Sequence, residues 1–592
     1  MGTSYHLGPC LQLSEHTPEM PKDAEESQKA STKECAVGDG SGSAMVFAVA
    51  ATILSMECAP GSLWLDTGEF GAVSARLSIS HPPGHPLHAL LTKATQLFLP
   101  IGDLGFRSNL LSVVCVAGAL SVFYGLLRTL APRNHPLVHA VFALTPLLFT
   151  PVYEQEVRAE VYALQLLLSV ALALISWRVS EGEDRRWLPL LALVFGLAGC
   201  NHSFIGLYWI PFALFAMWRG ESKRREIMAA SVSGAFALAL YAYLPLRALS
   251  GGEVGWGSPD TYARFIDTVT GRAWMHNLLP GDQAPGVIDS ISLLAGYVIQ
   301  HYGVALGVVS LCMIAFAVPA WVRERRGVVL TVFIAAGLPF ILRLGNEVDL
   351  SNPDLGGYLA CGLLAMAGLT ALAYEDLSER YSKVLIALLV VSISIQSALA
   401  LHRVDPSGDR SSERYVRALL AEAPIDGVLI TSDYSTTFTA WALRAFEGAR
   451  PDLGLLYRGQ VHQEWHRKRA ASALPRLGAR LKSYPASFMA QDVRWELGVK
   501  LDSLGALRSR LVPVGLSLAA DGALPSADQY AAAFRVFEQA GFAGRRFRAL
   551  MHVHYVEQLR HIGAPADLID WHLRALAQVA PDDPVTKTLL GR

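Results

Sequence analysis

Two carboxylates and two histidines lie close together in a polar, proline-containing segment at residues 64–88. Asp66 and Glu69 are three residues apart, so on a helical turn both side chains face the same way. One carboxylate could take a proton while the other orients a partner or binds a cation. Similar acidic pairs also occur as solvated or helix-capping residues. A catalytic pair and a structural pair therefore both remain open at this point.

The two histidines belong to the sequence His-Pro-Pro-Gly-His-Pro at residues 81–86. Proline lacks a backbone donor and fixes φ, which predicts a stiff turn rather than a helix. His81 and His85 could contact a phosphate or, together with Asp66, a metal ion. Two histidines four residues apart in a proline turn do not form the helical metal pair, so we predict no metal site. A turn with only a structural role is the alternative.

Two further polar positions adjoin apolar segments. Glu160 enters the start of an apolar run, where a carboxylate is costly unless it faces a wet cavity. His202 follows Asn201 at a turn between two apolar runs. These two side chains could form hydrogen bonds across helices or meet a ligand. On these grounds alone a structural role for Asn201 and His202 is favoured.

Arg247 ends the apolar run YAYLPLR. A guanidinium at such a place could bind a lipid-linked phosphate through paired hydrogen bonds. An arginine that only extends toward lipid headgroups is the alternative.

The composition indicates the kind of protein that must position these residues. The chain has 592 residues, of which 52% are hydrophobic and 17% charged, and its mean hydropathy is +0.32. These values predict a polytopic membrane protein. A formal charge of −1 without a long basic run excludes nucleic acid as a partner. The seven cysteines contain no C-x-x-C pair, so neither zinc nor a disulfide framework is indicated.

Apolar runs long enough to cross a bilayer predict about eleven spans. They lie near residues 44–61, 107–127, 137–153, 158–177, 187–201, 203–218, 227–246, 289–318, 328–344, 356–374 and 384–402. Between the first two, at residues 87–98, apolar side chains recur at helical spacing, which predicts a helix in the membrane interface.

The basic residues predict the orientation. One alternating set of short loops is rich in Lys and Arg, which places that set in the cytoplasm. Residues 1–43 then form a disordered cytoplasmic tail, and residues 44–402 form the membrane domain. Its first outer loop, residues 62–106, carries Asp66. Residues 403–592 lie on the outer side as a soluble α/β or mainly helical domain, in which residues 427–457 predict strand, helix and strand.

Several motifs resemble one known class of enzyme. They are LWLDTGEF, HPPGHPL, FRSNLLSVVCVAGALSVFYGLL, AEVYALQ, GLAGCNH, YLPLR and NPDLGGYL. Together they resemble the GT-C membrane glycosyltransferases. The most similar family is that of bacterial membrane proteins related to the animal transmembrane protein O-mannosyltransferase that acts on plexin-type domains. The resemblance covers about residues 45–460.

This resemblance implies a function. The enzyme would move a sugar, with mannose as the expected one, from a polyprenyl phosphate carrier to an acceptor hydroxyl, with inversion. The acceptor would be a protein Ser or Thr, or a glycan, on the outer side of the membrane. Asp66 would be the general base, with Glu69 beside it. Arg247, with His81 or His85, would stabilise the phosphate charge. No cofactor is implied beyond the lipid-linked donor. The expected location is the bacterial inner membrane, with the active site and residues 403–592 in the periplasm.

Two other classes stay open from the sequence. A multi-span transporter or lipid flippase fits the composition equally well, but transporters usually show internal repeats, whereas the polar motifs here concentrate on one face. A non-catalytic assembly protein, in which Asp66 is only structural, is the other.

Overall fold

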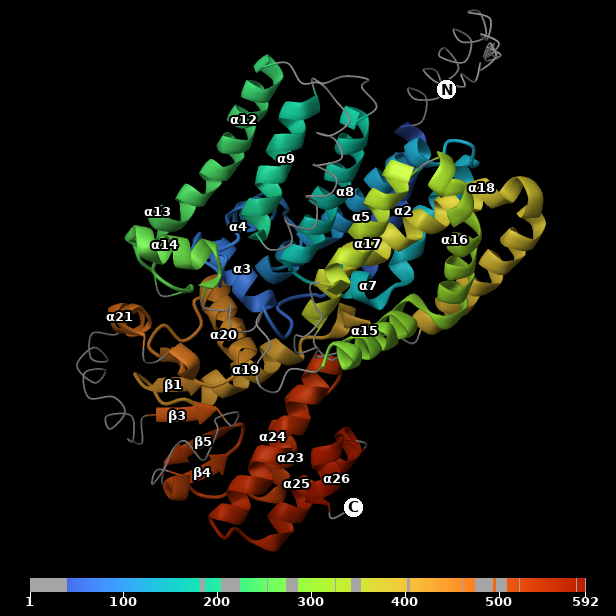
Figure 1. The fold of residues 1–592 in the computed structure, drawn as a ribbon. Helices are drawn as coiled ribbons and strands as arrows, with labels where there is room; N and C mark the ends of the chain where they lie inside the picture. Colours follow the sequence, from blue (N-terminus) through green and yellow to red (C-terminus); the bar gives the residue numbers. More distant parts are fainter. Residues whose placement is uncertain are drawn as a thin grey trace, which may run out of the picture.

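The structure is a computed structural model, and it describes most of the chain from residue 40 to residue 590. The ranges left out are 1–39, 181–186, 204–223, 253, 273–285, 325, 342–352, 402–404, 461–462, 474–492, 497–507, 521, 582 and 591–592. Figure 1 shows a large group of helices above a smaller region that contains the only sheet of the described part. The predicted tail, residues 1–43, lies almost wholly outside the described residues.

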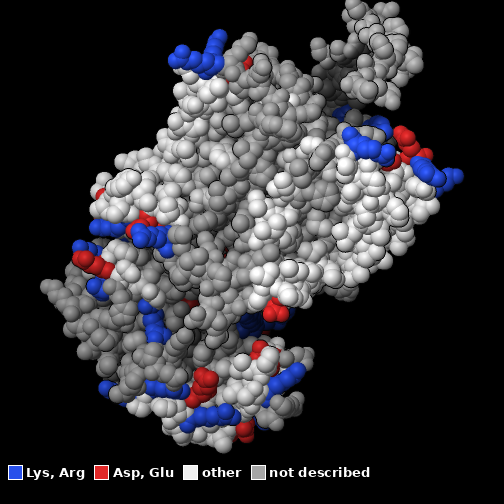
Figure 2. Space-filling view, viewed as in Figure 1, with Lys and Arg blue, Asp and Glu red and all other residues white. Residues whose placement is uncertain are grey.

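Six helical segments of the described chain are long and apolar enough to cross a membrane. They are Gly40–Glu57 (α2), Leu104–Leu130 (α5), Val161–Ser180 (α8), Arg224–Ser250 (α12, η4 and α13), Val304–Arg323 in α16 and Asp354–Ala400 in α18. On the face drawn in Figure 2, charged side chains gather toward the two ends of the molecule and leave a broad, mostly uncharged band between them. A polytopic membrane protein is the class that these features define.

Several predicted spans are interrupted in the structure. The predicted single span at 289–318 is two helices, α15 (Val287–Tyr302) and α16 (Val304–Glu324), which meet at Gly303 with φ 89°. The predicted span at 137–153 is bent by 79° between Pro136–Leu148 and Thr150–Glu156 (α7). Hydropathy did not reveal these breaks because the residues on both sides are apolar. The predicted spans at 356–374 and 384–402 lie in the two halves of α18 (Pro353–Ala400), which is two helices joined at a kink with non-helical torsions at Tyr381.

The remaining predicted spans have mixed outcomes. Residues 187–201 form the short apolar helix α9 (Leu188–Asn201), and residues 328–344 form α17 (Arg326–Ile341). The predicted span at 203–218 lies outside the described residues. With the bent pair counted as one span, the described part has up to seven spans. The expected number of eleven stays a prediction.

The first outer loop contains two short helices, α3 (Thr67–Arg76) and α4 (Pro86–Phe98), joined by the proline turn. The helix predicted at 87–98 is therefore confirmed. In Figure 1 these two helices, in blue, lie between the membrane helices and the C-terminal region in orange and red. The other helices of the membrane part are α6 (Pro136–Leu144), η1 (Thr145–Leu148), α12 (Arg224–Leu238), η4 (Ala239–Ala242), α13 (Tyr243–Ser250) and α14 (Tyr262–Val269).

The C-terminal region is built on a mixed sheet with the strand order β2-β1-β3-β5-β4. Strand β1 (Val428–Thr431) pairs in parallel with β2 (Gly454–Tyr457) and β3 (Val493–Glu496). Strand β5 (Ser517–Ala520) pairs antiparallel with β3 and with β4 (Leu511–Val514). The parallel pair of β1 and β2 is joined by α20 (Tyr434–Glu447), so the predicted strand, helix and strand are confirmed.

Helices surround this sheet and complete the region. They are η6 (Pro406–Gly408), α19 (Ser411–Glu422), η7 (Arg458–Gln460), α21 (Glu464–Ala473), α23 (Ala527–Phe534), η10 (Arg535–Phe537), α24 (Phe542–His561), α25 (Ala566–Val579) and α26 (Pro584–Leu589). One apolar core fills the membrane helices and a second one fills the C-terminal region. Trp64, from the first outer loop, belongs to the second core, and its ring packs against Tyr415 and Phe547.

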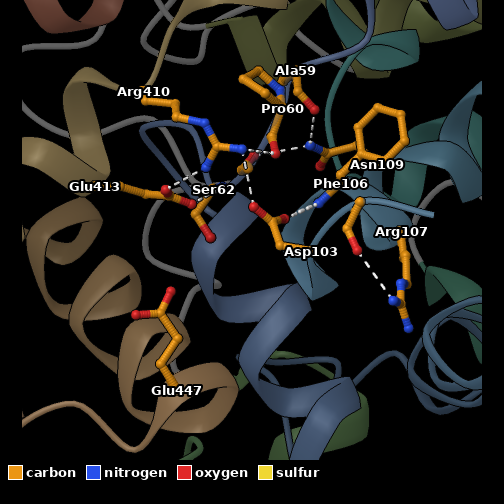
Figure 3. A network of polar contacts seen from close by, with 12 residues as sticks. Ala59, Pro60, Ser62, Asp103, Phe106, Arg107, Asn109, Arg410, Glu413 and Glu447 are labelled. Carbon is orange, nitrogen blue, oxygen red and sulfur yellow. Dashed lines mark hydrogen bonds and ion pairs between the residues drawn. The ribbon is translucent and has the colours of Figure 1, made fainter. Parts of the chain in front are cut away.

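A polar clamp also joins the two regions (Figure 3). Arg410, just before α19, binds the Asp103 carboxylate at 3.0 Å and the Pro60 carbonyl at 2.8 Å. It also pairs with Glu413, which in turn accepts the backbone N–H of Ser62 at 2.8 Å. These contacts attach the chain before α3, at Pro60 and Ser62, and the end of the first outer loop, at Asp103, to the C-terminal region. They help to position α3 against that region.

Candidate active site

Asp66 and Glu69 are placed at the start of α3. Asp66 is the N-cap residue, yet its carboxylate accepts no capping hydrogen bond, and Glu69 lies in the first turn. Between them, Gly68 packs directly on α20, because a Cβ at this position would lie 2.7 Å from the Phe438 backbone. A glycine is required for this approach. His81 lies close to both carboxylates, and the expectation that they serve one catalytic site stays a prediction.

Glu69 and His81 form a tight, buried pair. The Glu69 side chain is fully buried, and its two oxygens lie 2.6 Å from the His81 backbone nitrogen and 2.6 Å from His81 Nδ1. A carboxylate in this position accepts, so His81 Nδ1 carries a proton. Burial by itself lowers the pKa of His81, but the Glu69 and Asp66 carboxylates outweigh it and raise the pKa to about 10. His81 is therefore held as a cation near neutral pH.

The second ring nitrogen of His81 faces Asp66. The distance from His81 Nε2 to Asp66 Oδ2 is 4.0 Å, and the Asp66 side chain is 18% exposed. Burial raises the pKa of Asp66 to about 7, with contributions from Asp354 and Glu69, although the charge of His81 opposes the shift. A carboxylate with such a pKa changes its protonation near physiological pH. It can act there as a base.

A second charged group lies nearby and contains a residue that the sequence analysis missed. Arg158 is 5% exposed, and its guanidinium lies 2.9 Å from Glu160 and 2.8 Å from Asp354. Glu160 was expected to face a wet cavity, but it is 1% exposed and paired with this arginine. Burial raises the pKa of Glu160 even so. An Arg two residues before Glu160, and the first basic residue after Glu154 and Glu156, was the signal that could have revealed the pair.

His85 and His202 also lie in this group of side chains. The His85 ring is 5.1 Å from the His81 ring and 5.3 Å from the His202 ring, measured between centroids. His85 Nδ1 lies 2.5 Å from the backbone carbonyl oxygen of Asn201. His202 packs against Tyr162 and Tyr358. The structure thus brings together five of the expected site residues, namely Asp66, Glu69, His81, His85 and His202, with Glu160 close by.

Arg247 lies elsewhere. Its guanidinium donates to the backbone carbonyls of Leu77 and Arg76, at the C-terminal end of α3. Because α3 has ten residues, this end is about 15 Å from Asp66. In this arrangement Arg247 anchors α13 to α3. The expected role in phosphate binding stays a prediction.

Aromatic residues from both the membrane part and the C-terminal region lie beside the acidic pair. Trp256, from the loop before α14, lies 6.4 Å from the His81 ring and packs against Phe438 and Tyr457. Burial raises the pKa of the Tyr434 hydroxyl, and the nearby Asp66 and Asp354 carboxylates raise it further. No sequence motif indicates these contacts, because Trp256 and Tyr434 lie 190 and 368 positions from Asp66.

Comparison with known proteins defines the class and then the relatives. The structure is similar to the crystal structure of ArnT from Cupriavidus metallidurans bound to undecaprenyl phosphate, with a TM-score of 0.52 and 12% identity. That match covers 82% of this chain and 99% of ArnT. At this identity it shows the fold alone. The chain is an integral membrane protein with a GT-C-like fold.

The sequence comparisons are more specific. Residues 66–227 match the family model described as the N-terminal domain of protein O-mannosyl-transferase TMEM260. The mouse (Mus musculus) protein O-mannosyl-transferase TMEM260 is 25% identical over 463 residues, which is 73% of this chain. The chain spans just under two thirds of the mouse protein, at 65%. The resemblance expected from the motifs is thereby confirmed, and the matched region begins at Asp66.

Proposed function

We propose that this protein is a membrane glycosyltransferase that moves a sugar, with mannose as the first candidate, from a polyprenyl phosphate to a protein Ser or Thr hydroxyl. The observation that carries the proposal is the position of Asp66. It is the first residue of the region that matches the O-mannosyl-transferase family, and its carboxylate is poised to titrate near pH 7 beside a cationic histidine. The likeness to ArnT, whose crystal structure is bound to undecaprenyl phosphate, supports the choice of donor.

The reaction is a single displacement. The Asp66 carboxylate takes the proton of the acceptor hydroxyl while the hydroxyl oxygen attacks the anomeric carbon of the donor. The bond from that carbon to the phosphate oxygen breaks, and its electron pair leaves with the polyprenyl phosphate. Attack opposite the leaving group inverts the anomeric configuration. The phosphate is a good leaving group, so the acceptor hydroxyl is the partner that needs a base.

His81 and Glu69 support this base. The positive charge of His81 opposes the effect of burial on Asp66 and keeps part of it ionised near neutral pH. Glu69 acts through His81, because both of its oxygens are engaged by that residue. We therefore assign Glu69 as a positioning residue rather than a group that touches substrate.

A metal-independent reaction is part of the proposal. Asp66, Glu69 and His81 could offer three ligand atoms within 4.8 Å of one another. Their existing contacts already account for these groups, since Glu69 neutralises His81 and His81 faces Asp66. Transfer that survives treatment with a chelator supports this, whereas loss of transfer with recovery on adding a divalent cation contradicts it.

The membrane setting belongs to the same proposal. We place the site and residues 403–592 on the outer side of a membrane crossed by about eleven spans, with residues 1–43 as the cytoplasmic tail. The donor lipid would approach through the membrane helices, and the acceptor through the C-terminal region. The bacterial inner membrane rests on the motif resemblance, whereas the curated relative is from mouse. Cysteine labelling of each side in intact cells or vesicles tests the orientation.

The deciding experiment measures transfer of radiolabelled sugar from synthetic polyprenyl phosphate donors to membrane extracts. Purified wild-type protein is compared with Asp66→Asn, and both are checked for intact folding by thermal melting in detergent. Transfer by the wild type that is lost in the variant supports the enzyme and its base. If the folded wild type binds donors without consuming them, the transporter or flippase alternative takes its place. Equal transfer by both proteins would make Asp66 merely structural.

A further inference from the structure

His85 stands out among the buried polar side chains near the proposed base. Its side chain is 1% exposed, and in the part of the chain that the structure describes its Nε2 atom has no hydrogen-bond partner. A buried polar atom left without a partner destabilises the folded protein. A ligand that supplies the missing hydrogen-bond partner would remove this cost.

The Asn201 contact settles which kind of atom Nε2 is. His85 Nδ1 lies 2.5 Å from the Asn201 carbonyl oxygen, and a carbonyl can only accept. The Nδ1 atom therefore carries the hydrogen. In the neutral ring Nε2 then presents a lone pair and can only accept a hydrogen bond.

The surroundings keep the ring neutral. Burial lowers the pKa of His85 well below its ordinary value, and the neighbouring His81 and His202 lower it further. The charged group that faces the His85 ring is the cationic His81. Among the described residues, no carboxylate lies at hydrogen-bond distance from this ring. A phosphodiester oxygen offers no proton, so it has nothing to donate to Nε2. A hydroxyl does.

The backbone at this position also carries a cost. His85 has φ 40° and ψ 51°, in the left-handed region, which is disfavoured for a non-glycine residue. Glycine would adopt this conformation without that cost. A histidine here indicates that its side chain contributes something in return.

The position favours the donor over the acceptor. The His81 ring contacts Trp256, which packs on Phe438 of the C-terminal region, and it also contacts His85. His85 is bonded to the end of α9, in the membrane part. Under the proposed function, a lipid-linked sugar would approach from that part of the molecule and a protein acceptor from the C-terminal region.

We propose that Nε2 of His85 accepts a hydrogen bond from one hydroxyl of the donor sugar and thereby helps to select the sugar. The inference rests on the proposed function, and it replaces the phosphate role that the sequence suggested for His85. Asn201, through its backbone carbonyl, is the residue that fixes the tautomer.

The test is a set of donors that each lack one sugar hydroxyl, assayed with wild type, His85→Phe and His88→Phe. For wild type, one deoxy donor is expected to be transferred about 10- to 100-fold more slowly than the parent sugar, as for the loss of one buried hydrogen bond. In His85→Phe the parent donor slows to a similar extent and that one deoxy donor does not, so the ratio falls to about one. His85→Gln, which retains an acceptor oxygen, recovers part of the discrimination.

His88→Phe is the matched control. His88 is also 1% exposed with an unpartnered Nε2 among the described residues, and it packs on Phe70 as His85 does. It lies one helical turn further along α4, so its replacement leaves every donor ratio unchanged. Thermal melting of each variant confirms folding.

Four results would overturn the inference. Deoxy ratios that do not change in His85→Phe make His85 structural. If His85→Phe loses as much affinity for sugar-free polyprenyl phosphate as for the sugar-bearing donor, His85 binds the phosphate and not the sugar. If His85→Phe changes the preference among acceptors and leaves the donor ratios constant, the hydroxyl that binds Nε2 belongs to the acceptor. A wild type that transfers no sugar from any donor refutes the proposed function itself, and this inference with it.

Discussion

Two carboxylates, the partly buried Asp66 and the fully buried Glu496, have pKa values raised to a similar extent and differ in their hydrogen bonds. Burial raises the pKa of Asp66 at the start of α3 to about 7, and it raises the pKa of Glu496 at the end of β3 to about 7 as well. Acidity alone therefore does not distinguish a reactive carboxylate from a structural one.

The contacts of the two groups do distinguish them. One oxygen of Glu496 accepts the backbone N–H groups of Ser432 and Asp433 at 2.8 and 3.0 Å. The other accepts the hydroxyls of Thr436 and Tyr415. Asp66 receives no capping hydrogen bond, and its nearest charged partner is His81 at 4.0 Å. Glu496 locks the turn from β1 into α20, while Asp66 keeps its oxygens available for a substrate.

The largest expected effect comes from Asp66→Asn. Loss of a general base lowers transfer by about 10²- to 10⁴-fold. The variant should be no less stable than wild type at pH 8. The pKa of Asp66 is raised in the folded state, so ionisation of this carboxyl makes the wild-type protein less stable as pH rises through that pKa. Sugar transfer and thermal melting at pH 8 check both parts. Normal transfer by Asp66→Asn, or failure of the variant to fold, would mean that Asp66 is a structural carboxylate like Glu496.

Glu69→Gln should have the next largest effect. The variant removes the charge that holds His81, so we expect transfer to fall by about 10- to 100-fold, in line with one charge-assisted hydrogen bond. The pKa of His81 should also fall, because Glu69 is the main group that raises it. Rate profiles at high pH should then lose activity earlier than in wild type. An unchanged alkaline limb with reduced activity would reduce Glu69 to a packing role.

Glu496→Gln should affect stability rather than chemistry. The amide nitrogen takes the place of the oxygen that accepts from the Thr436 and Tyr415 hydroxyls, so both hydroxyls lose this acceptor, which destabilises the fold by about 1–3 kcal/mol. Turnover per folded molecule should stay the same. Chemical denaturation together with active-fraction measurements gives both quantities. Lower turnover at unchanged stability would indicate that Glu496 belongs to the reaction.

On the acidic side, the pH dependence of transfer should follow Asp66. The base works only when ionised, so activity should fall about tenfold per pH unit below the pKa of about 7. The Glu496→Gln variant should show the same midpoint. Rates measured from pH 5 to 9 test this, and a midpoint near the ordinary aspartate value would contradict the burial argument.

The smallest effect is expected for Arg410→Ala, in the clamp of Figure 3. The Arg410 side chain is 41% exposed, and exposed ion pairs contribute about 1 kcal/mol or less. Melting should drop slightly and transfer should not change. A large loss of transfer would mean that the position of α3 depends on this clamp more than on the core around Trp64.

Much of the candidate site could be predicted from the sequence, because its residues fall in one short polar segment. Asp66, Glu69, His81 and His85 lie within 20 positions, where a helix and a proline turn bring them together. The role of Glu69 as the partner of His81, and the pairing of Arg158 with Asp354, were not predictable. These contacts depend on how helices separated by many residues pack.

The sequence by itself determined that the chain is a membrane protein, where the main apolar helices run, and which polar segment holds the site. Hydropathy and helical spacing are local properties, and they need no knowledge of neighbours. Only the tertiary structure decided the breaks at Gly303 and Phe149, the engagement of Arg247 by α3 and the contact of α20 with Gly68. It also decided the acidity of Asp66, because burial and nearby charges come from distant parts of the chain.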